Sequence, residues 1–285
     1  MTRLAITGYA SLDYPVRLAG MVEPDRTTRI AARSPAAWPR AGGCPAYAAR
    51  AAARAGADAA PVTWIGGGPE GAIYLDRLGA DVRRDGIAQL AVDRSPSALL
   101  VYQADGSCAC LYDPAFAGQE RLTDAQAACI ASASHLAVSV GPPHLLGRIL
   151  SLQAPGARLY WMAKDDPAAF PPAMAAELAR TADVVFCNRA ERALVGPTPA
   201  LVVETRGPAG AVLWRGERAE PFAAAPAGTS TDGIDTTGAG DTLAGAFIAF
   251  EMLAGFAAPE DAARALRAGL AAAASLLQGR TGETA

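Results

Sequence analysis

The chain has 285 residues, of which 51% are hydrophobic, so it is long and apolar enough for one large α/β domain or two small ones with a buried core. Its 25 basic and 28 acidic residues give a net charge of −3 and form no basic block, so the composition does not suggest nucleic-acid binding. No apolar run approaches the roughly 18 residues of a membrane span, and no signal-peptide core precedes the first strand-like stretch, so we expect a soluble cytoplasmic protein with no membrane partner.

Short apolar strands alternate with helical segments along most of the chain. The expected strands cover residues 4–8, 61–66, 136–140, 158–162, 183–187, 200–204 and 211–214, and the expected helices cover residues 46–55, 71–78, 143–153, 171–181, 241–254 and 259–277. An Asp-Gly turn at 105–106 predicts a β-hairpin over residues 97–112. This alternation is typical of a mainly parallel, doubly wound sheet. No linker or change of composition divides the chain, so we predict a single α/β domain over residues 1–285.

The cysteine, histidine and lysine positions argue against three kinds of site. The five cysteines are odd in number and contain no Cys-x-x-Cys pair, which argues against a disulfide framework, and the two histidines do not suggest a zinc site. Lys164 is the only lysine, and no glycine precedes it, so the chain has no P-loop of the Gly-Lys-Ser/Thr type. Lys164 follows an expected strand and lies beside Asp165 and Asp166; contact with a phosphate is one interpretation, and a solvated loop is the one we favour.

One segment carries the strongest chemical signal. It reads Asp-Thr-Thr-Gly-Ala-Gly-Asp from Asp235 to Asp241 and leads directly into an apolar helix. The start of a helix attracts anions through free N–H groups and the positive end of its dipole, and Gly238 and Gly240 let the backbone approach a ligand closely. Asp241 would lie ionised within reach of the same anion. An anion site beside a carboxylate base is what phosphoryl transfer to a hydroxyl requires.

This segment resembles the signature of the PfkB/ribokinase family of ATP-dependent carbohydrate and nucleoside kinases, Asp-Thr-x-Gly-Ala-Gly-Asp, at every position. The resemblance implies a three-layer α/β/α ribokinase-like fold with a mainly parallel central sheet. It also implies a small β-sheet lid, formed here by segments near residues 14–41 and 97–112. In several family members the lid is a dimer interface, so the resemblance allows a homodimer through the lid.

The resemblance assigns roles within this segment. Asp241 would be the base, and Asp235 and Thr237 lie where some relatives bind a monovalent cation, so K⁺ is an optional cofactor. The backbone groups expected to stabilise the transferring phosphoryl are those of Gly238, Ala239 and Gly240.

Two segments near the N-terminus resemble the family's substrate site. Asp13 matches the acid that follows the family's first strand and accepts hydrogen bonds from sugar hydroxyls; an ordinary turn acid is the alternative. Gly42 and Gly43 begin a stretch that resembles Gly-Gly-x-x-x-Asn, in which the glycines line the sugar pocket. Tyr47 stands where the family usually has asparagine, and a phenol brings a longer reach and a face for stacking. Packing between helix and sheet is the alternative role for Tyr47, and the identity of the substrate stays open.

Two later turns resemble the nucleotide site. Asn188 and Glu191 match an Asn-x-x-Glu motif that holds the water shell of Mg²⁺ and the ATP phosphates, and their spacing places them on one face of a helix start. Helix capping is the alternative. Arg206 lies in a turn that resembles Thr-x-Gly-x-x-Gly, where it would either reach a phosphate or be solvated, as an arginine in a turn usually is. The matching residues of this turn, expected to bind the nucleotide, are Thr205, Arg206, Gly207 and Gly210.

The sequence therefore predicts an ATP- and Mg²⁺-dependent kinase that phosphorylates a hydroxymethyl group of a free sugar. Cys44 stands where the Gly-Gly stretch of some relatives has lysine, which favours an unphosphorylated acceptor. The alternatives are a nucleoside kinase of the same family and a non-catalytic nucleotide- or metabolite-binding sensor. A nicotinamide-dependent oxidoreductase rests only on the Gly-x-Gly-x-x-Gly match at residues 66–71, which we interpret as a structural turn.

Overall fold

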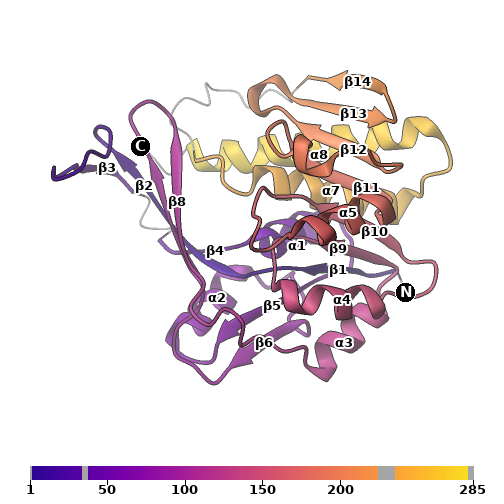
Figure 1. The fold of residues 1–285 in the computed structure, drawn as a ribbon. Coiled ribbons are helices and arrows are strands. Elements are labelled where there is room, and N and C mark those ends of the chain that lie inside the picture. The colour runs from indigo at the N-terminus through magenta and orange to yellow at the C-terminus, as the bar shows by residue number, and fades with distance from the viewer. Residues whose placement is uncertain (1, 34–37, 224–234, 282–285) are drawn as a thin grey trace.

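The computed structural model describes residues 2–33, 38–223 and 235–281. Within these ranges the chain forms a nine-stranded sheet and a smaller five-stranded sheet, with helices on both faces of the large one (Figure 1). The large sheet has the strand order β14-β13-β12-β11-β10-β9-β1-β5-β6. Its strands are β1 (Leu4–Thr7), β5 (Ala59–Gly66), β6 (Ile87–Leu90), β9 (His135–Val138), β10 (Arg158–Met162), β11 (Val184–Asn188), β12 (Leu201–Thr205), β13 (Ala211–Arg215) and β14 (Arg218–Phe222).

The large sheet is mainly parallel, as predicted. Every neighbouring pair is parallel except β12–β13 and β13–β14, which are antiparallel. β1 is the third strand from the β6 edge and lies between β5 and β9, where Leu4 pairs with Ala59 on one side and with His135 on the other. β1 and β5 are buried along their whole length, which is typical of parallel strands that are covered on both faces.

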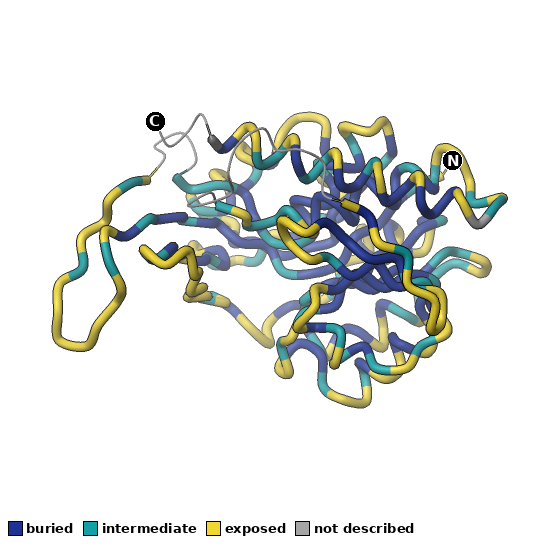
Figure 2. Tube along the Cα trace, turned by 90° about the horizontal axis from the view of Figure 1, so that it is seen from above, coloured by how far each residue is buried: buried dark blue, intermediate teal, exposed yellow. Residues whose placement is uncertain are grey.

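Side chains along the strands alternate between two cores, one on each face of the large sheet. In β1, Leu4 and Ile6 join the core on one face, whereas Ala5 joins the core on the other. The helices of the first face are α1 (Cys44–Arg54), α2 (Pro69–Leu78), α7 (Ala239–Ala254) and α8 (Pro259–Thr281), and those of the second are α3 (Asp124–Ala131), α4 (Pro143–Ser151), α5 (Pro172–Thr181) and the short α6 (Arg192–Val195). The three-layer α/β/α architecture is confirmed, and Figure 2 shows the buried strands at its centre.

Helices α1 and α7 approach each other closely. A Cβ atom at Gly245 would lie 2.1 Å from the backbone oxygen of Ala48, so only glycine permits this separation. The contact fixes α7 against α1. The loops that precede both helices are thereby held at one edge of the large sheet.

The small sheet is built from the two segments that the sequence identified as a lid, together with residues 11–13. Its strands are β2 (Ser11–Leu18), β3 (Ile30–Ala32), β4 (Arg40–Gly42), β7 (Ser97–Tyr102) and β8 (Cys108–Asp113). The predicted hairpin is present as β7 and β8, and β7 lies parallel to β2. β2 begins three residues before the predicted segment. Asp13 therefore lies within a strand, not in a loop after β1.

None of the described helices is long and apolar enough to cross a lipid bilayer.

Candidate active site

The sequence-predicted residues come together at the carboxyl edge of the large sheet. Ser139 directly follows β9, Lys164 lies two residues beyond β10, and Asn188 and Thr205 end β11 and β12. The carboxyl edge is where open α/β sheets bind ligands, because the loops there face a common space. The loop before α7 lies at the same edge, since Asp241 acts electrostatically on both Cys44 and Lys164.

The start of α7 is shaped as an anion site. Gly238 is the residue before the helix and adopts a left-handed conformation with φ of 77°, which glycine takes without strain. The N–H of Ala239 donates to the Thr236 oxygen at 3.1 Å. Ala239 therefore does not offer the free amide that the resemblance implied. The N–H groups of Gly240 and Asp241 lie in the first turn and have no acceptor within the helix.

The side chain of Tyr47, from α1, packs against the turn that precedes α7. A Cβ atom at Gly238 would lie 2.5 Å from the Tyr47 ring, so the ring packs directly against the glycine. The Tyr47 hydroxyl donates to Asp13 Oδ2 at 2.8 Å, and the side chain is buried. The structure thus places Tyr47 as a link between the anion site and Asp13. Its ring packs against the turn before α7, whereas the packing alternative placed it between helix and sheet.

Asp13 is a buried carboxylate on β2. Burial raises the pKa of Asp13 above its ordinary value, although the hydrogen bond from Tyr47 and the charge of Arg40 oppose this. A Cβ atom at Gly42 would lie within 2.3 Å of this carboxyl group, so the glycine makes room for it. Gly43, with φ of 82°, makes room in the same way for the backbone oxygen of Tyr9.

Lys164 lies in the loop that follows β10, partly exposed to solvent, and it forms an ion pair there with Glu191. Its Nζ is 3.7 Å from Glu191 Oε1, and its side chain is 39% exposed. The charge of Asp241 outweighs burial and raises the pKa of Lys164. Lys164 therefore forms a charged cluster with Asp241 and Glu191.

Asn188 and Glu191 bond to each other's backbone. Asn188 N–H donates to Glu191 Oε2 at 2.7 Å, and Glu191 N–H donates to Asn188 Oδ1 at 2.8 Å. This reciprocal pattern is that of a capping box, and Asn188 ends β11 without joining a helix. Burial raises the pKa of Glu191, against the charge of Lys164.

The residues here fit a role at the water shell of Mg²⁺. The described part of the chain holds no group of three or more side chains that would bind a metal directly. Glu191 Oε1 is turned toward Lys164 and is the oxygen left to accept from a metal-bound water. Such sparse contact suits Mg²⁺, which keeps several waters and arrives with nucleotide phosphates.

The turn after β12 is closed by its own contacts. Arg206 N–H donates to the Gly210 oxygen at 2.7 Å, and Gly207 and Gly210 have φ of 55° and 90°. The Arg206 side chain donates from Nε to Glu204 Oε1 at 2.8 Å. Thr205 donates to the Cys187 oxygen at 3.4 Å. The charge of Arg206 is thus partly neutralised by a buried carboxylate.

Asp235 is surrounded by donors from three other elements. Arg40 of β4 forms an ion pair with it, and the Tyr102 hydroxyl of β7 donates to it. Arg280 of α8 donates to the backbone oxygens of Asp235 and Thr237 at 2.7 and 2.6 Å. Burial opposes ionisation of Asp235, but the charges of Arg280 and Arg40 prevail and hold its pKa below the ordinary value. Sequence reasoning did not identify Arg40, Tyr102 or Arg280.

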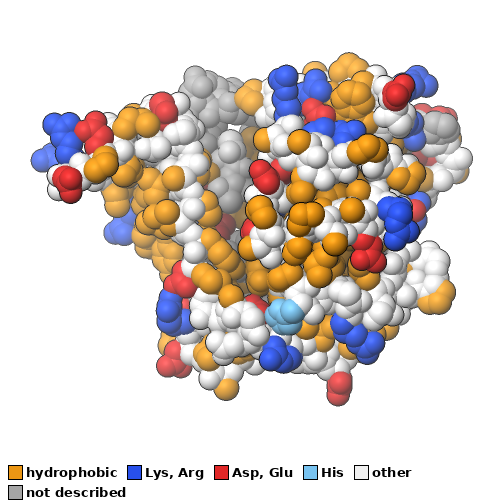
Figure 3. All heavy atoms as spheres, viewed as in Figure 1, with side chains coloured by type: hydrophobic (Ala, Val, Ile, Leu, Met, Phe, Trp, Pro, Cys, Tyr) orange, Lys and Arg blue, Asp and Glu red, His pale blue; other side chains and the backbone are white. Residues whose placement is uncertain are grey.

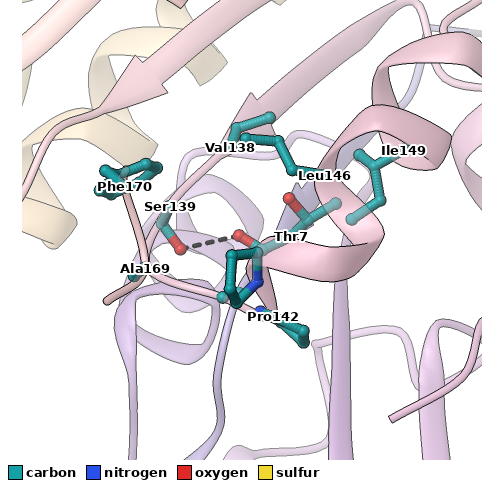
Figure 4. Close-up of a pocket in the computed structure, with 11 residues that line it drawn as sticks. Thr7, Val138, Ser139, Pro142, Leu146, Ile149, Ala169 and Phe170 are labelled. Atoms are coloured by element: carbon teal, nitrogen blue, oxygen red, sulfur yellow. Dashed lines mark hydrogen bonds between the residues drawn. The ribbon is translucent and has the colours of Figure 1, made fainter. Parts of the chain in front are cut away.

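An apolar cavity lies beside the site, between β1, β9 and α4 (Figure 4). Its labelled lining includes Val138, Leu146 and Phe170, and Ser139 Oγ donates to the Thr7 oxygen at 2.7 Å. These apolar side chains belong to the core opposite α7. The cavity therefore lacks the donors that a phosphate needs.

The turn at residues 66–71 is filled by protein. Cβ atoms at Gly66 and Gly68 would lie within 3 Å of the backbone of residues 92–94, and Glu70 accepts a hydrogen bond from Ser95 N–H at 2.6 Å. No space is left against these glycines for a dinucleotide. This favours the structural interpretation of the motif.

The chain matches the family model described as pfkB family carbohydrate kinase over residues 1–284. No curated protein sequence matches it significantly.

Solved structures share its fold. The ribokinase of Cryptococcus neoformans var. grubii serotype A in complex with ADP aligns with a TM-score of 0.80 and 20% identity, covering 100% of this chain and 97% of that one. The Arabidopsis thaliana ribokinase complexed with ribose and ATP aligns with a TM-score of 0.76 and 21% identity, covering 100% of this chain and 96% of that one. The Burkholderia thailandensis nucleoside kinase in complex with inosine aligns with a TM-score of 0.73 and 18% identity, covering 99% of this chain and 100% of that one. The three-layer fold with its small sheet is thus ribokinase-like.

Proposed function

We propose that this chain, which belongs to the pfkB family of carbohydrate kinases, transfers the γ-phosphate of ATP to a hydroxymethyl group of a free sugar. The observation that carries the proposal is the position of Asp241. It lies in the first turn of α7, beside amides that lack an intrahelical acceptor and within the electrostatic reach of Lys164. A candidate base (Asp241), free amides that can bind an anion and a cation (Lys164) thus lie close together at the start of α7.

In this proposal each residue acts on the acceptor or on the phosphate charge. Asp241 accepts the proton of the acceptor hydroxyl while its oxygen attacks the γ-phosphorus and the bond to ADP breaks. The amides of Gly238 and Gly240 and the Lys164 ammonium stabilise the charge on the transferring phosphoryl. Asp13, oriented by Tyr47, accepts hydrogen bonds from the sugar hydroxyls.

Two solved relatives carry ADP or ATP, which supports ATP as the donor. Mg²⁺ would enter with the nucleotide and supply charge neutralisation between the phosphates. Glu191 and Asn188 would hold its water shell, and Thr205, Arg206, Gly207 and Gly210 would lie near the nucleotide. The pairing of Arg206 with Glu204 weakens its pull on a phosphate.

A nucleoside is the second candidate acceptor, and one aromatic pair favours it. The rings of Tyr9 and Tyr112 have centroids 6.2 Å apart, and Tyr112 is 42% exposed on β8. Burial raises the pKa of Tyr9 to about 12, with contributions from the charges of Glu120 and Asp166. A neutral aromatic surface near the substrate acid suits stacking against a base.

We further propose that the small sheet serves as a lid and as a homodimer interface. Phosphoryl transfer requires a site that excludes water, and Arg40 and Tyr102 already join this sheet to Asp235. Hydrophobic side chains gather along the sheet in Figure 3. Those that are exposed include Ile30, Leu99 and Leu111.

The decisive experiment measures ADP release with Mg-ATP against a panel of free sugars and nucleosides. We expect turnover with one class of acceptor. Asp241→Asn keeps the carboxylate's shape without its basicity, so it should reduce kcat by about 10²–10⁴-fold. Asp76→Asn, on a side chain 82% exposed on α2, is the matched control and should retain full turnover.

Near-normal turnover of Asp241→Asn would refute the assignment of the base. Nucleotide binding without transfer to any acceptor would instead favour a non-catalytic sensor. Turnover on nucleosides alone would replace the sugar by the second candidate.

A further inference from the structure

Arg280 is a buried cation at the end of α8 that the proposed chemistry does not use. It is 6% exposed. Its Nη1 donates to the backbone oxygens of Asp235 and Thr237 at 2.7 and 2.6 Å and lies 3.5 Å from Asp235 Oδ1. Three oxygens, two of them carbonyls, therefore converge on one guanidinium nitrogen.

Such a set of oxygens calls for a positive charge. Carbonyl and carboxylate oxygens are the ligands that hard cations select, and left without a cation they would be costly to bury. Arg280 supplies the charge and a donor directed at both carbonyls. A metal cation bound by the same three oxygens would coincide with its nitrogen. The expected monovalent cation at Asp235 and Thr237 therefore does not fit this site.

The Arg280 guanidinium also contacts the aromatic ring of Tyr47. Its central carbon lies 5.8 Å from the centroid of the Tyr47 ring, which in turn packs under Gly238. Arg40 neutralises Asp235 from β4. Because arginine stays protonated at any physiological pH, this charge does not depend on the salt in solution.

We propose that Arg280 is a built-in cation that replaces a bound monovalent ion beneath the 235–238 turn, so that this protein neither binds nor requires K⁺ there. Arg280 acts as a positioning residue. By holding the carbonyls at 235 and 237 it fixes the backbone that leads into Gly238 and the amides of α7. The structural part of the inference stands on these contacts alone, and its catalytic consequence rests on the proposed kinase function.

The first test uses thermal unfolding of the full chain in KCl, NaCl and tetramethylammonium chloride at equal ionic strength. We expect the wild-type Tm to be the same in all three salts. Arg280→Ala should lower Tm in tetramethylammonium and recover about 2–4 °C specifically in K⁺, because the vacated oxygens then bind the ion. Millimolar guanidinium should restore Tm in the same variant.

The control is Arg267→Ala, which removes an exposed cation from the same helix and should show no K⁺-specific recovery. Arg280→Lys retains a cation, so its Tm should be the same in K⁺ and in tetramethylammonium. This variant replaces Arg280→Ala in the test if Arg280→Ala fails to fold. A K⁺-specific rise of the wild-type Tm would overturn the proposal. So would an Arg280→Ala variant that folds and recovers with neither K⁺ nor guanidinium.

The second test measures turnover with the acceptor found by the panel. We expect wild-type kcat to be equal in K⁺ and tetramethylammonium, and Arg280→Ala to be activated at least about 10-fold by K⁺, a coupling of about 1.4 kcal/mol. K⁺ activation of the wild type would overturn the inference. If no acceptor is turned over, the kinase proposal fails, whereas the unfolding measurements still decide the role of Arg280.

Discussion

At the scale of single residues, Lys164 changes most between sequence and structure. The sequence offers it as an isolated lysine between an alanine and two aspartates. The fold places its ammonium 3.7 Å from Glu191 Oε1 and within the field of Asp241. Two carboxylates at the carboxyl edge of a parallel sheet would repel both each other and a phosphate. In the proposed reaction, Lys164 offsets that repulsion and supplies positive charge to the γ-phosphate.

Removal of this charge should therefore reduce phosphate transfer more than folding. We expect Lys164→Met to lower kcat by about 10²–10³-fold, the size of effect seen when one donor to a transition-state charge is lost. Lys164→Arg should retain part of the activity. Because the chain has one lysine, an amine-reactive label followed by peptide mapping reports on this side chain, and Mg-ATP should protect it. Wild-type kcat in Lys164→Met would contradict this role.

At the scale of elements, the start of α7 depends on a side chain from another helix. The turn into α7 needs a left-handed residue at 238, and the Tyr47 ring of α1 fills the space where a Cβ would lie. The same phenol fixes Asp13 of β2. The turn into α7 and the buried Asp13 carboxyl are thus both positioned by Tyr47.

The two glycines of the turn should respond differently to alanine. Gly238→Ala introduces both positive-φ strain and a clash with Tyr47, so we expect a loss of about 1–3 kcal/mol in the free energy of unfolding. Gly240→Ala has no neighbour within 4 Å of the new Cβ and should leave stability unchanged or slightly raised. Urea-induced unfolding followed by fluorescence measures both. Equal effects of the two substitutions would show that the Tyr47 contact does not constrain the turn.

At the scale of the whole molecule, the small sheet ends in exposed strands. β8 forms one edge, and the short strands β3 and β4 form the other. Exposed apolar side chains include Ile30 at 56% on β3 and Leu111 at 61% on β8. An edge strand with exposed hydrophobic side chains is a ready template for pairing with another chain. On this ground we propose that the surface binds a second copy of the same protein.

We expect the protein to sediment as a dimer. Leu111→Asp, which adds a charge to the exposed edge, should shift sedimentation equilibrium toward the monomer without unfolding the chain. Leu253→Asp changes a side chain that is equally exposed, at 61%, at the end of α7 and should leave the dimer intact. A monomeric wild type at micromolar concentration would remove the proposed interface.

The sequence by itself determined the alternation of strands and helices, the mainly parallel sheet, the hairpin and the family of the chain. These depend on local periodicity, on turn chemistry and on one contiguous motif, all of which can be read along the chain. It did not reveal the short strands β6 and β14, whose formation depends on neighbouring strands, nor α3, despite the capping box between Thr123 and Gln126.

Only the tertiary structure decided which charges meet. Arg280 and Asp235 lie 45 residues apart, and Tyr47 and Asp13 lie 34 apart. No local pattern encodes such pairs, because their geometry results from how whole helices pack on the sheet. The folded chain therefore places Arg280 against the residues where the motif allowed a monovalent cation, and pairs Lys164 with Glu191.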